Sequence, residues 1–586
     1  MEIPKLKNIP HSRLSVTTFR GYHRGLKIGD GEFSHMENFT SDCYPVLATR
    51  PGREIVARPE NPLGLCGKDA LCCIDGSAFV MNDYRLELGL SDSPKDLVSM
   101  GAYVIIFPDK KYVNTADLSD YGDIEAEFTA AGAVSFSLCD IEGKDYAVSS
   151  VGTAAPAEPE NLQLWLDTGE MKLKQWSATL VTWVVVESTY VKIATSGIGK
   201  SFSRHDGVSL SGLEGALTDA VTGAVLENTQ ELADLCGSHV IWEKGEDFIV
   251  VTGLLEKNYC VIAPLSVSRR LPRMDFVIEC GNRLWGCRYG LNHDGAVVNE
   301  IYASKLGDFR NWNCFMGTST DSYIMSLGSD GPFTGAVTHL DHPLFFKEAF
   351  LHKVYGSFPE NFSLQTTPCR GVQKGSHKSL ALVGEMLYYK APSCVCRYDG
   401  SLPVEVSEDL GEVRYHDAIG GCLGRKYYIS MLDEQNNPHL FVYDTSRQLW
   451  HREDGFRPLC FAPWDGGLYA IDMADNTIKA MTGGEEVFPW CLQTGDLGLD
   501  DPGQKYISGL TVRMALEPGG QAEFYVNYNF DDNWEYVCTV HPSPLGSFAL
   551  PVRPMRCDHL RLKIEGRGEA RIYGITRRIE RGSDVP

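Results

Sequence analysis

Short apolar strands separated by glycine turns follow one another through the middle of the chain. Two successive copies of one unit occupy residues 418–451 and 459–481, each with an apolar strand, a Gly turn, an aromatic strand and a further strand. The aromatic strand recurs at Tyr388, Tyr427 and Tyr469, and a spacing of about forty residues is typical of a β-propeller blade. A small meander cannot bury both of its faces alone, so the pattern predicts sheets stacked around an axis.

The number of such units sets the predicted size of the propeller. Six or seven blades are expected from starts near Leu65, Met100, Phe276, Gly335, Ser379, Ala418 and Leu459. The alternative is a row of hairpins in an ordinary β-sandwich. Helical periodicity is weak, because the best stretches, 123–131 and 215–235, are short or lack a clean apolar face. The expected fold class is therefore all-β.

The remaining segments predict further domains around the blades. Residues 1–60 contain many glycines and the breaks Pro45 and Pro51, which indicate an extended N-terminal arm lying over other elements. Blades are expected at 61–150 and again at 270–487. A linker-like stretch and short strands between them predict an inserted small β-barrel or sandwich at 155–265.

The last segment, 488–586, alternates polar and apolar residues, as in Arg561-Leu-Lys-Ile564. Such alternation indicates strands with one buried and one solvated face. It predicts a C-terminal jelly-roll-like β-sandwich.

Composition and charge narrow the function classes. The 586 residues are 43% hydrophobic and 22% charged, with 58 Gly and 29 Pro, which fits a globular protein rich in turns. The net charge of −23 argues against a protein that binds nucleic acid through its phosphate groups. Residues 551–581 hold nine Arg or Lys against four acids, so this end carries +5 and the rest −28. This division either steers partners or reflects solvated strand faces.

The sequence contains no signal-peptide-like start and no run of about eighteen apolar residues. We expect a soluble protein made in a cytoplasm, without membrane insertion. The eighteen cysteines are scattered along strands, which favours reduced buried thiols over a disulfide scaffold. Cys72-Cys73 and Cys394-x-Cys396 are the close pairs, and neither has a second pair at zinc spacing.

One stretch resembles a phosphate-binding loop. Residues 194–201 read Ala-Thr-Ser-Gly-Ile-Gly-Lys-Ser after a predicted strand. Phosphate binding needs a helix that starts at the lysine, whereas a glycine and strand formers follow. A hairpin turn is the better interpretation.

Three other patterns carry possible chemistry. His339-Leu-Asp-His342 has part of a metal-ligand spacing, but Val337 stands where a third ligand would be expected. Residues 304–312 are similar to the aspartate-box turns of sialidase propellers, which close hairpins and carry no catalysis. A glycosidase would need two converging carboxylates, which the sequence cannot identify among 77 acids. No catalytic residue, cofactor or metal is therefore assigned.

Several motifs along the chain point to one family: Gly29-Asp-Gly-Glu-Phe33, Glu37–Asp42 with Tyr44–Gly52, Asn299–Ser304 with Gly307–Trp312, and Leu550–Leu562 with Gly566-Arg-Gly568. Together these motifs resemble tailed-phage propeller proteins of the tail nozzle or packaged-DNA stabilisation group. The resemblance implies a virion structural protein without enzymatic activity. In that family, copies form a ring below the portal and adaptor and line the DNA exit channel.

The resemblance also implies partners and a location. We expect a homo-oligomeric ring in the virion tail, assembled in the cytoplasm of the bacterial host. Its neighbours would be portal, adaptor and other tail proteins, and DNA would pass transiently without specific binding. From the charge division alone, we hypothesise that an acidic lumen would repel DNA during ejection and that the basic C-terminal faces would dock on acidic neighbours.

Two alternatives remain open. A tail-tip adhesin or carbohydrate-binding propeller would need exposed aromatic residues, for which Tyr528 and Trp534 are candidates. A propeller glycosidase would need an acid pair with shifted pKa values in a pocket.

Overall fold

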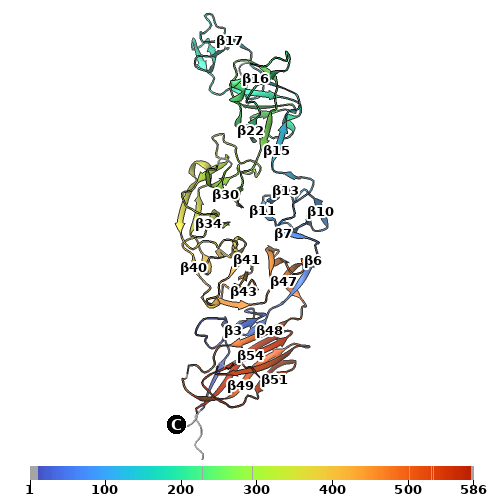
Figure 1. The fold of residues 1–586 in the computed structure, drawn as a ribbon, viewed down its shortest axis with the longest axis vertical. Helices are drawn as coiled ribbons and strands as arrows, with labels where there is room; N and C mark the ends of the chain where they lie inside the picture. The colour runs from blue at the N-terminus through green and yellow to red at the C-terminus, as the bar shows by residue number, and fades with distance from the viewer. Residues whose placement is uncertain are drawn as a thin grey trace, which may run out of the picture. The chain divides into compact units, whose positions relative to one another are not determined.

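The computed structural model describes residues 11–226, 229–292, 295–500, 502–529, 531 and 533–581. The chain forms two compact units. Unit 1 comprises residues 1–97, 333–353 and 366–586, and unit 2 comprises residues 98–332 and 354–365. Residues 1–10, part of the arm expected from the sequence, lie outside the described residues. Nearly all regular structure is β (Figure 1).

Helices are few and short in the described ranges. The α-helix α1 (Gln230–Ala233) lies inside the stretch 215–235, whereas the stretch 123–131 contains strand β15 (Ala126–Thr129). Four 3-10 turns complete the set: η1 (Ile198–Lys200), η2 (Pro359–Asn361), η3 (His377–Ser379) and η4 (Glu408–Leu410). None of these helices has the length and apolar character needed to cross a membrane.

Unit 1 contains antiparallel four-stranded meanders of the propeller-blade type. The first joins β7 (Pro62–Gly67), β8 (Leu71–Asp75), β9 (Ala78–Met81) and β10 (Tyr84–Glu87). The second joins β33 (Gly335–His339), β34 (His342–Lys347), β35 (Phe350–Tyr355) and β36 (Ser363–Pro368), of which residues 354–365 are assigned to unit 2. The third joins β37 (Ala381–Val383), β38 (Met386–Lys390), β39 (Val395–Tyr398) and β40 (Val404–Glu405). The fourth joins β41 (His416–Leu423), β42 (Lys426–Leu432), β43 (Pro438–Asp444) and β44 (Leu449–Arg452).

The last blade is completed by a strand from the start of the chain. Strands β45 (Pro458–Trp464), β46 (Gly467–Asp472) and β47 (Ile478–Gly484) form three of its members, and β6 (Gly52–Ala57) pairs antiparallel with β47. Figure 1 shows the blue β6 beside the orange β47. First strands of consecutive blades, β37, β41, β45 and β7, contact one another in series, so the first strand of each meander faces its neighbours around the axis.

Unit 2 contains two more blades. They are β11 (Asp96–Met100), β12 (Tyr103–Phe107), β13 (Lys111–Asn114) and β14 (Tyr121–Asp123), and then β29 (Phe276–Cys280), β30 (Arg283–Leu291), β31 (Val297–Ala303) and β32 (Tyr323–Ser326). Seven blade-type sheets can thus be counted within the described residues. The predicted all-β fold with a six- or seven-bladed propeller, an inserted β domain and a C-terminal sandwich is confirmed.

The inserted domain in unit 2 consists of three sheets. One has the order β15, β28 (Ser266–Arg269), β22 (Gly207–Ser211) and β24 (Gly237–Val240). The second has the order β23 (Thr218–Asp219), β27 (Tyr259–Ile262), β16 (Ala133–Cys139), β21 (Tyr190–Ala194), β26 (Phe248–Thr252) and β25 (Glu243–Lys244). The third joins β17 (Val148–Gly152), β18 (Leu164–Asp167), β19 (Lys172–Ser177) and β20 (Thr182–Val185).

The insert begins earlier than the sequence pattern indicates. Strand β15 pairs with β28, and β16 pairs with β21 and β27. Residues 126–139 therefore belong to the inserted sheets, although we predicted blade strands up to residue 150. The alternation within β16 is the same whichever strand lies beside it, so it does not reveal these distant partners.

The sandwich in unit 1 is built from both ends of the chain. Its first sheet has the order β4 (Phe39–Thr40), β5 (Leu47–Thr49), β55 (Ala570–Arg581), β49 (Lys505–Leu516) and β52 (Ser543–Leu550), with β1 (His11–Val16) beside β55 and β53 (Arg556–Cys557) beside β49. Its second sheet has the order β2 (Gly21–Tyr22), β3 (Glu32–Glu37), β48 (Pro489–Thr494), β54 (Leu560–Arg567), β50 (Gln521–Tyr528) and β51 (Glu535–Val540).

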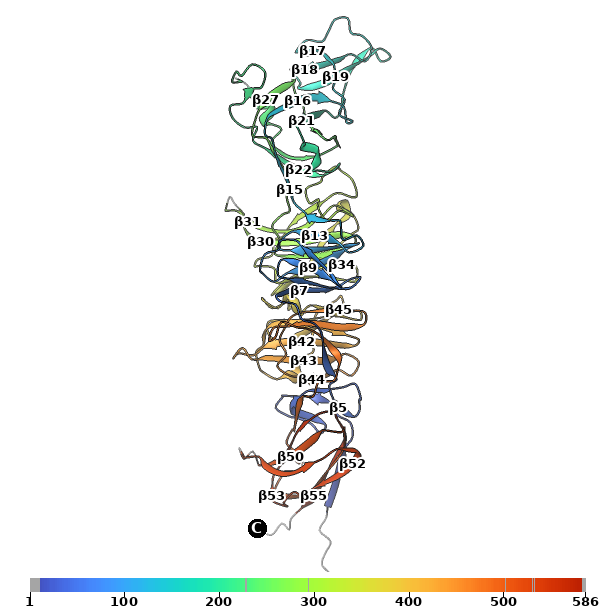
Figure 2. The ribbon, with the colours of Figure 1, turned by 90° about the vertical axis from the view of Figure 1, so that its right-hand side faces the viewer.

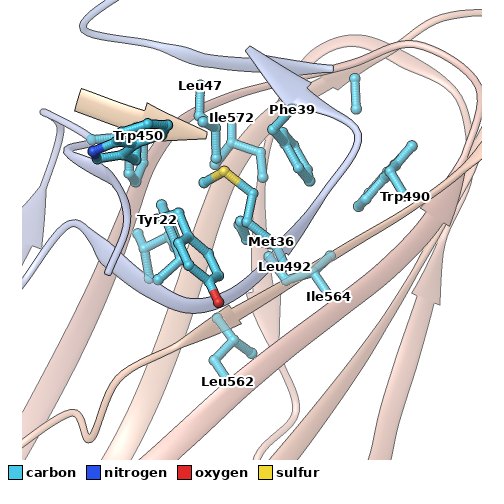
Figure 3. Packing of buried hydrophobic residues seen from close by; sticks show 14 of the residues in the cluster. Tyr22, Met36, Phe39, Leu47, Trp450, Trp490, Leu492, Leu562, Ile564 and Ile572 are labelled. Carbon is cyan, nitrogen blue, oxygen red and sulfur yellow. The ribbon is translucent and has the colours of Figure 1, made fainter. Parts of the chain in front are cut away.

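We predicted that the N-terminal segment is an arm lying over other elements. Instead, its described residues form strands within the sheets. Its glycines and prolines mark turns between short strands that are members of the sheets. Figure 3 shows Tyr22, Met36 and Phe39 packed among buried side chains of the sandwich, with Trp450 of the propeller at the same core. One continuous apolar core thus joins the sandwich to blade residues of unit 1.

Candidate functional site

Charged side chains are buried where the sandwich strands of unit 1 lead into the last blade. Arg50 follows β5, and Arg53 lies in β6. Arg53 contacts two carboxylates after β44, with Nη2 2.8 Å from Glu453 Oε2 and Nη1 2.7 Å from Asp454 Oδ2. Arg50 Nη1 lies 3.4 Å from Glu486 Oε2, between β47 and β48. The network links three segments that are far apart in the sequence.

Burial and the neighbouring charges act in opposite directions on the members of this network. The Arg50 side chain is only 2% exposed and its guanidinium lies 4.0 Å from the centre of the Phe488 ring. Burial opposes the charge on Asp454, but Arg53 and Arg50 outweigh it and lower the pKa of Asp454. Burial likewise opposes the Arg53 cation, and the two carboxylates outweigh it and raise the pKa of Arg53. At Glu453 burial prevails over Arg53 and Arg50 and raises the pKa, so the network places a carboxyl with a raised pKa beside one with a lowered pKa.

A small hollow adjoins the network. Its volume is about 180 Å³, below the about 300–1,000 Å³ of ordinary ligand pockets. Its lining combines acids and arginines with small residues: Thr40, Asp42, Cys43, Ala48, Thr49, Arg50, Pro51, Ala515, Glu517, Glu569, Ala570 and Arg571. We assign no ligand to it.

The outer face of the first sandwich sheet is strongly basic. Exposed arginines project from five positions on neighbouring strands, here called the basic face: Arg13, Arg513, Arg556, Arg571 and Arg578. Arg578 pairs with Glu580 at 3.1 Å. The other four make no ion pair with any residue that the structure describes. A flat array of guanidinium groups suits a partner with an acidic surface.

The phosphate-loop-like stretch is a turn. Strand β21 ends at Ala194, Gly197 adopts φ +77°, and the single 3-10 turn η1 follows. The Lys200 ammonium lies 2.6 Å from the Glu246 carboxylate. No α-helix begins at Lys200, so the stretch is a turn. We predicted that it closes a hairpin, but it does not, because β21 pairs with β16 and β26 whereas the next strand, β22, pairs with β24 and β28.

The histidine pattern lies across a tight hairpin. His339 and His342 are directly opposite each other at the ends of β33 and β34. His339 Nε2 lies 2.8 Å from the Glu385 carbonyl oxygen, so this nitrogen of the buried ring is bound within the protein. In the described part of the chain, no three His, Cys, Asp or Glu side chains are grouped so as to hold a metal ion.

The aspartate-box-like stretch connects a blade to the inserted domain within unit 2. Asn311 accepts a hydrogen bond from the Gly207 backbone N–H at 3.0 Å and donates one to Asp206 at 2.9 Å. Asp206 in turn forms a buried ion pair with Arg269. The turn therefore has a structural role, as expected.

The aromatic candidates for an adhesin are mostly internal. Tyr528 is buried and donates a hydrogen bond to the Arg553 carbonyl at 2.9 Å, so it is not the exposed residue that this alternative required. Trp534 is half-buried, with the Lys563 ammonium 5.1 Å from its ring centre.

The eighteen cysteines are free thiols, and the Cys394 and Cys396 sulfurs lie 3.5 Å apart.

The sequence analysis missed a cluster of three tryptophans in the inserted domain. In the third sheet, the Trp183 ring lies 5.3 Å from Trp165 and 5.4 Å from Trp176. The available signal was an uncharged run from Gln175 to Val186 that contains two of these tryptophans.

Comparison with known proteins identifies no family. No family model and no curated protein matches the chain. Among solved structures, it is similar to an exo-β-1,3-galactanase from Phanerochaete chrysosporium, with 8% identity and a TM-score of 0.22 over 51% of this chain and 94% of that one. It is also similar to a glycoside hydrolase family 43 arabinoxylan arabinofuranohydrolase from Bacillus subtilis, with 8% identity and a TM-score of 0.16 over the same shares.

These matches correct one expectation. We expected no enzymatic activity, because the resemblance to the phage group implied none, whereas the matched structures are glycoside hydrolases. The expectation is contradicted and we withdraw it. Likeness at this level does not assign a reaction to this chain.

Proposed function

We propose that this protein is a structural component of a phage tail that assembles into a ring around the DNA exit channel. Within the virion it would contact portal, adaptor and other tail proteins, and DNA would pass through without specific binding. The observation that carries the proposal is the basic face, on a chain whose net charge is −23.

A closed ring needs a head-to-tail contact between two different surfaces of the same chain. The basic face supplies one such surface. Residues outside 551–581 carry a net charge of −28, so a second copy offers complementary acidic surface. Attraction of this kind orients partners and selects the register of the contact.

The segments that resemble the phage group also support the proposal. Residues 29–33, 37–42 and 44–52 contribute to β3, β4, β5 and β6 and include Arg50 of the buried network. These three motifs lie where the sandwich strands lead into the last blade of unit 1, whereas the motifs at 299–312 and 550–568 lie in or after β31 and in the sandwich.

The test is the mass of the purified protein by light scattering at two concentrations, in low and in high salt, followed by electron microscopy. We expect closed rings in low salt that dissociate in high salt, because salt screens exposed charges. Arg513→Glu with Arg571→Glu should abolish the rings. Arg567→Glu, an exposed arginine on the second sheet, serves as the matched control.

A monomer at every salt concentration would contradict the ring. If that monomer also released sugars from a polysaccharide, the glycosidase alternative would replace the proposal. Binding to glycans without turnover would favour the adhesin.

A further inference from the structure

The third sheet of the inserted domain has two unlike faces. Figure 2 shows its strands β17, β18 and β19. Leu164, Leu166 and Leu173 point to one face and are buried with Leu138 of β16, which attaches the sheet to its domain. Strand register places the three tryptophans on the other face, because Trp165 lies opposite Lys174 and Trp176 lies opposite Trp183.

One end of this sheet exposes large aliphatic side chains. Leu162 is 63% exposed, Leu180 67% and Val181 72%; these three residues are called the apolar end. Two hydrogen bonds join the segments that carry them: the Leu162 N–H donates to the Trp176 carbonyl at 2.9 Å, and the Ala178 N–H donates to the side-chain Oδ1 of Asn161 at 3.0 Å. Trp176 and Trp183 lie opposite each other on β19 and β20, the two strands on either side of Leu180 and Val181.

The backbone is strained at the same place. Leu162 has φ +66° and Val181 has φ +50°, in the left-handed region that favours Gly, Asn or Asp. Among the described residues, nine of the sixteen non-glycine residues with positive φ are Asn or Asp. A β-branched valine in this region is an outlier. Folding alone would select a different residue at 181, so the exposed aliphatic side chain indicates function.

The chemistry of the apolar end suits the interfacial layer of a lipid bilayer. From Gln175 to Val186 the chain has no charged side chain. Tryptophan beside exposed aliphatic residues is typical of segments that enter the boundary between headgroups and acyl chains. Such segments penetrate only about 5–10 Å, which a four-residue turn can reach. The nearby exposed acids Glu158, Glu160 and Glu187 oppose binding to anionic lipid.

We propose that the apolar end of this sheet adsorbs to a zwitterionic lipid surface. This inference is independent of the proposed ring. It differs from the expectation of no membrane insertion, which rested on the lack of a long apolar run; adsorption through a turn needs no such run.

The test is flotation of the full-length protein with phosphatidylcholine vesicles. We expect the wild type to float and Leu180→Ser with Val181→Asn to lose at least tenfold in partitioning. Asn accepts a positive φ, so the variant should keep or raise the melting temperature, and lost binding cannot then be attributed to misfolding. Brominated lipid should quench tryptophan fluorescence of the wild type, and Trp183→Phe should reduce that quenching.

The matched control is Met171→Asn at the opposite end of the same sheet. Met171 is also exposed and has φ +52°, so this variant relieves similar strain without touching the apolar end, and it should float normally. The proposal is overturned if the wild type stays with the soluble fraction, or if Met171→Asn loses partitioning equally. Self-association that Leu180→Ser with Val181→Asn abolishes, without flotation of the wild type, would assign the apolar end to a protein contact instead.

Discussion

Arg13 on β1 lies directly opposite Arg578 on β55, so two exposed guanidinium groups face each other across an antiparallel pair. Like charges at such positions oppose folding by about 0.2–1 kcal/mol. Arg13→Glu should therefore raise the free energy of unfolding by a similar amount. The measurement is urea unfolding in low and high salt, and the gain should shrink as salt rises. An unchanged midpoint in low salt would show that the two groups do not repel.

The Arg53 network should be costly to break. Arg53→Met leaves Glu453 and Asp454 buried without their closest cation, and we expect a loss of about 3–5 kcal/mol in unfolding free energy. The control is Arg85→Met, which removes a 2.7 Å pair with Asp75 from an exposed arginine and should cost much less. Equal losses in the two variants would refute a special role for burial.

Gly566 is predicted to tolerate no side chain. A Cβ atom at this position would lie 2.1 Å from the Trp490 ring, and Trp490 is held by a hydrogen bond from its Nε1 to the Gly568 carbonyl at 2.8 Å. Gly566→Ala should cost about 1–3 kcal/mol through overpacking. Gly509→Ala, whose Cβ would lie 3.7 Å from the Arg578 side chain, should be close to neutral. Differential scanning calorimetry of both variants decides the point.

Two buried histidines predict a loss of stability in mild acid. Burial, assisted by the charge of Lys347, lowers the pKa of His352 to about 4; burial and Lys426 lower the pKa of His451 to about 3. The unfolded chain binds these protons near the ordinary value of 6.5, so stability is full above that pH and falls as the pH drops towards 4. Urea midpoints between pH 7 and 4 should decline less steeply for His352→Phe than for the wild type. Parallel pH profiles would contradict this assignment.

The repeat of Tyr388, Tyr427 and Tyr469 was sufficient to predict the propeller, because a side-chain period reports what each strand must bury. The alternation of Arg561 to Ile564 likewise predicted the sandwich. The sequence contains no comparable pattern for the pairing of strands that are far apart in the chain. Strand β6 resembles any other short strand in its sequence, and nothing within residues 52–57 indicates that its partner lies near residue 480.

The buried network of Arg50 and Arg53 also depends on contacts between segments that are far apart in the sequence. Arg50 and Arg53 are unremarkable among 54 basic residues, and only folding brings them to Glu453, Asp454 and Glu486. The basic face was partly visible as an excess of arginine near the end of the chain, but Arg13 and Arg513 join it only through strand register. The strain at Val181 is a backbone property, which composition does not record.

The pairing of β6 with β47 also orders events during synthesis. Residues 52–57 leave the ribosome early, yet the strand they join is made more than four hundred residues later, and the sandwich needs β48 to β55 later still. Contacts of such long sequence separation form slowly, and until then the early strands have unpaired edges open to unwanted pairing. The last blade and the sandwich are thus expected to form together, once β47 to β55 have been synthesised, which makes the synthesis of these strands the step that commits this unit to its native state.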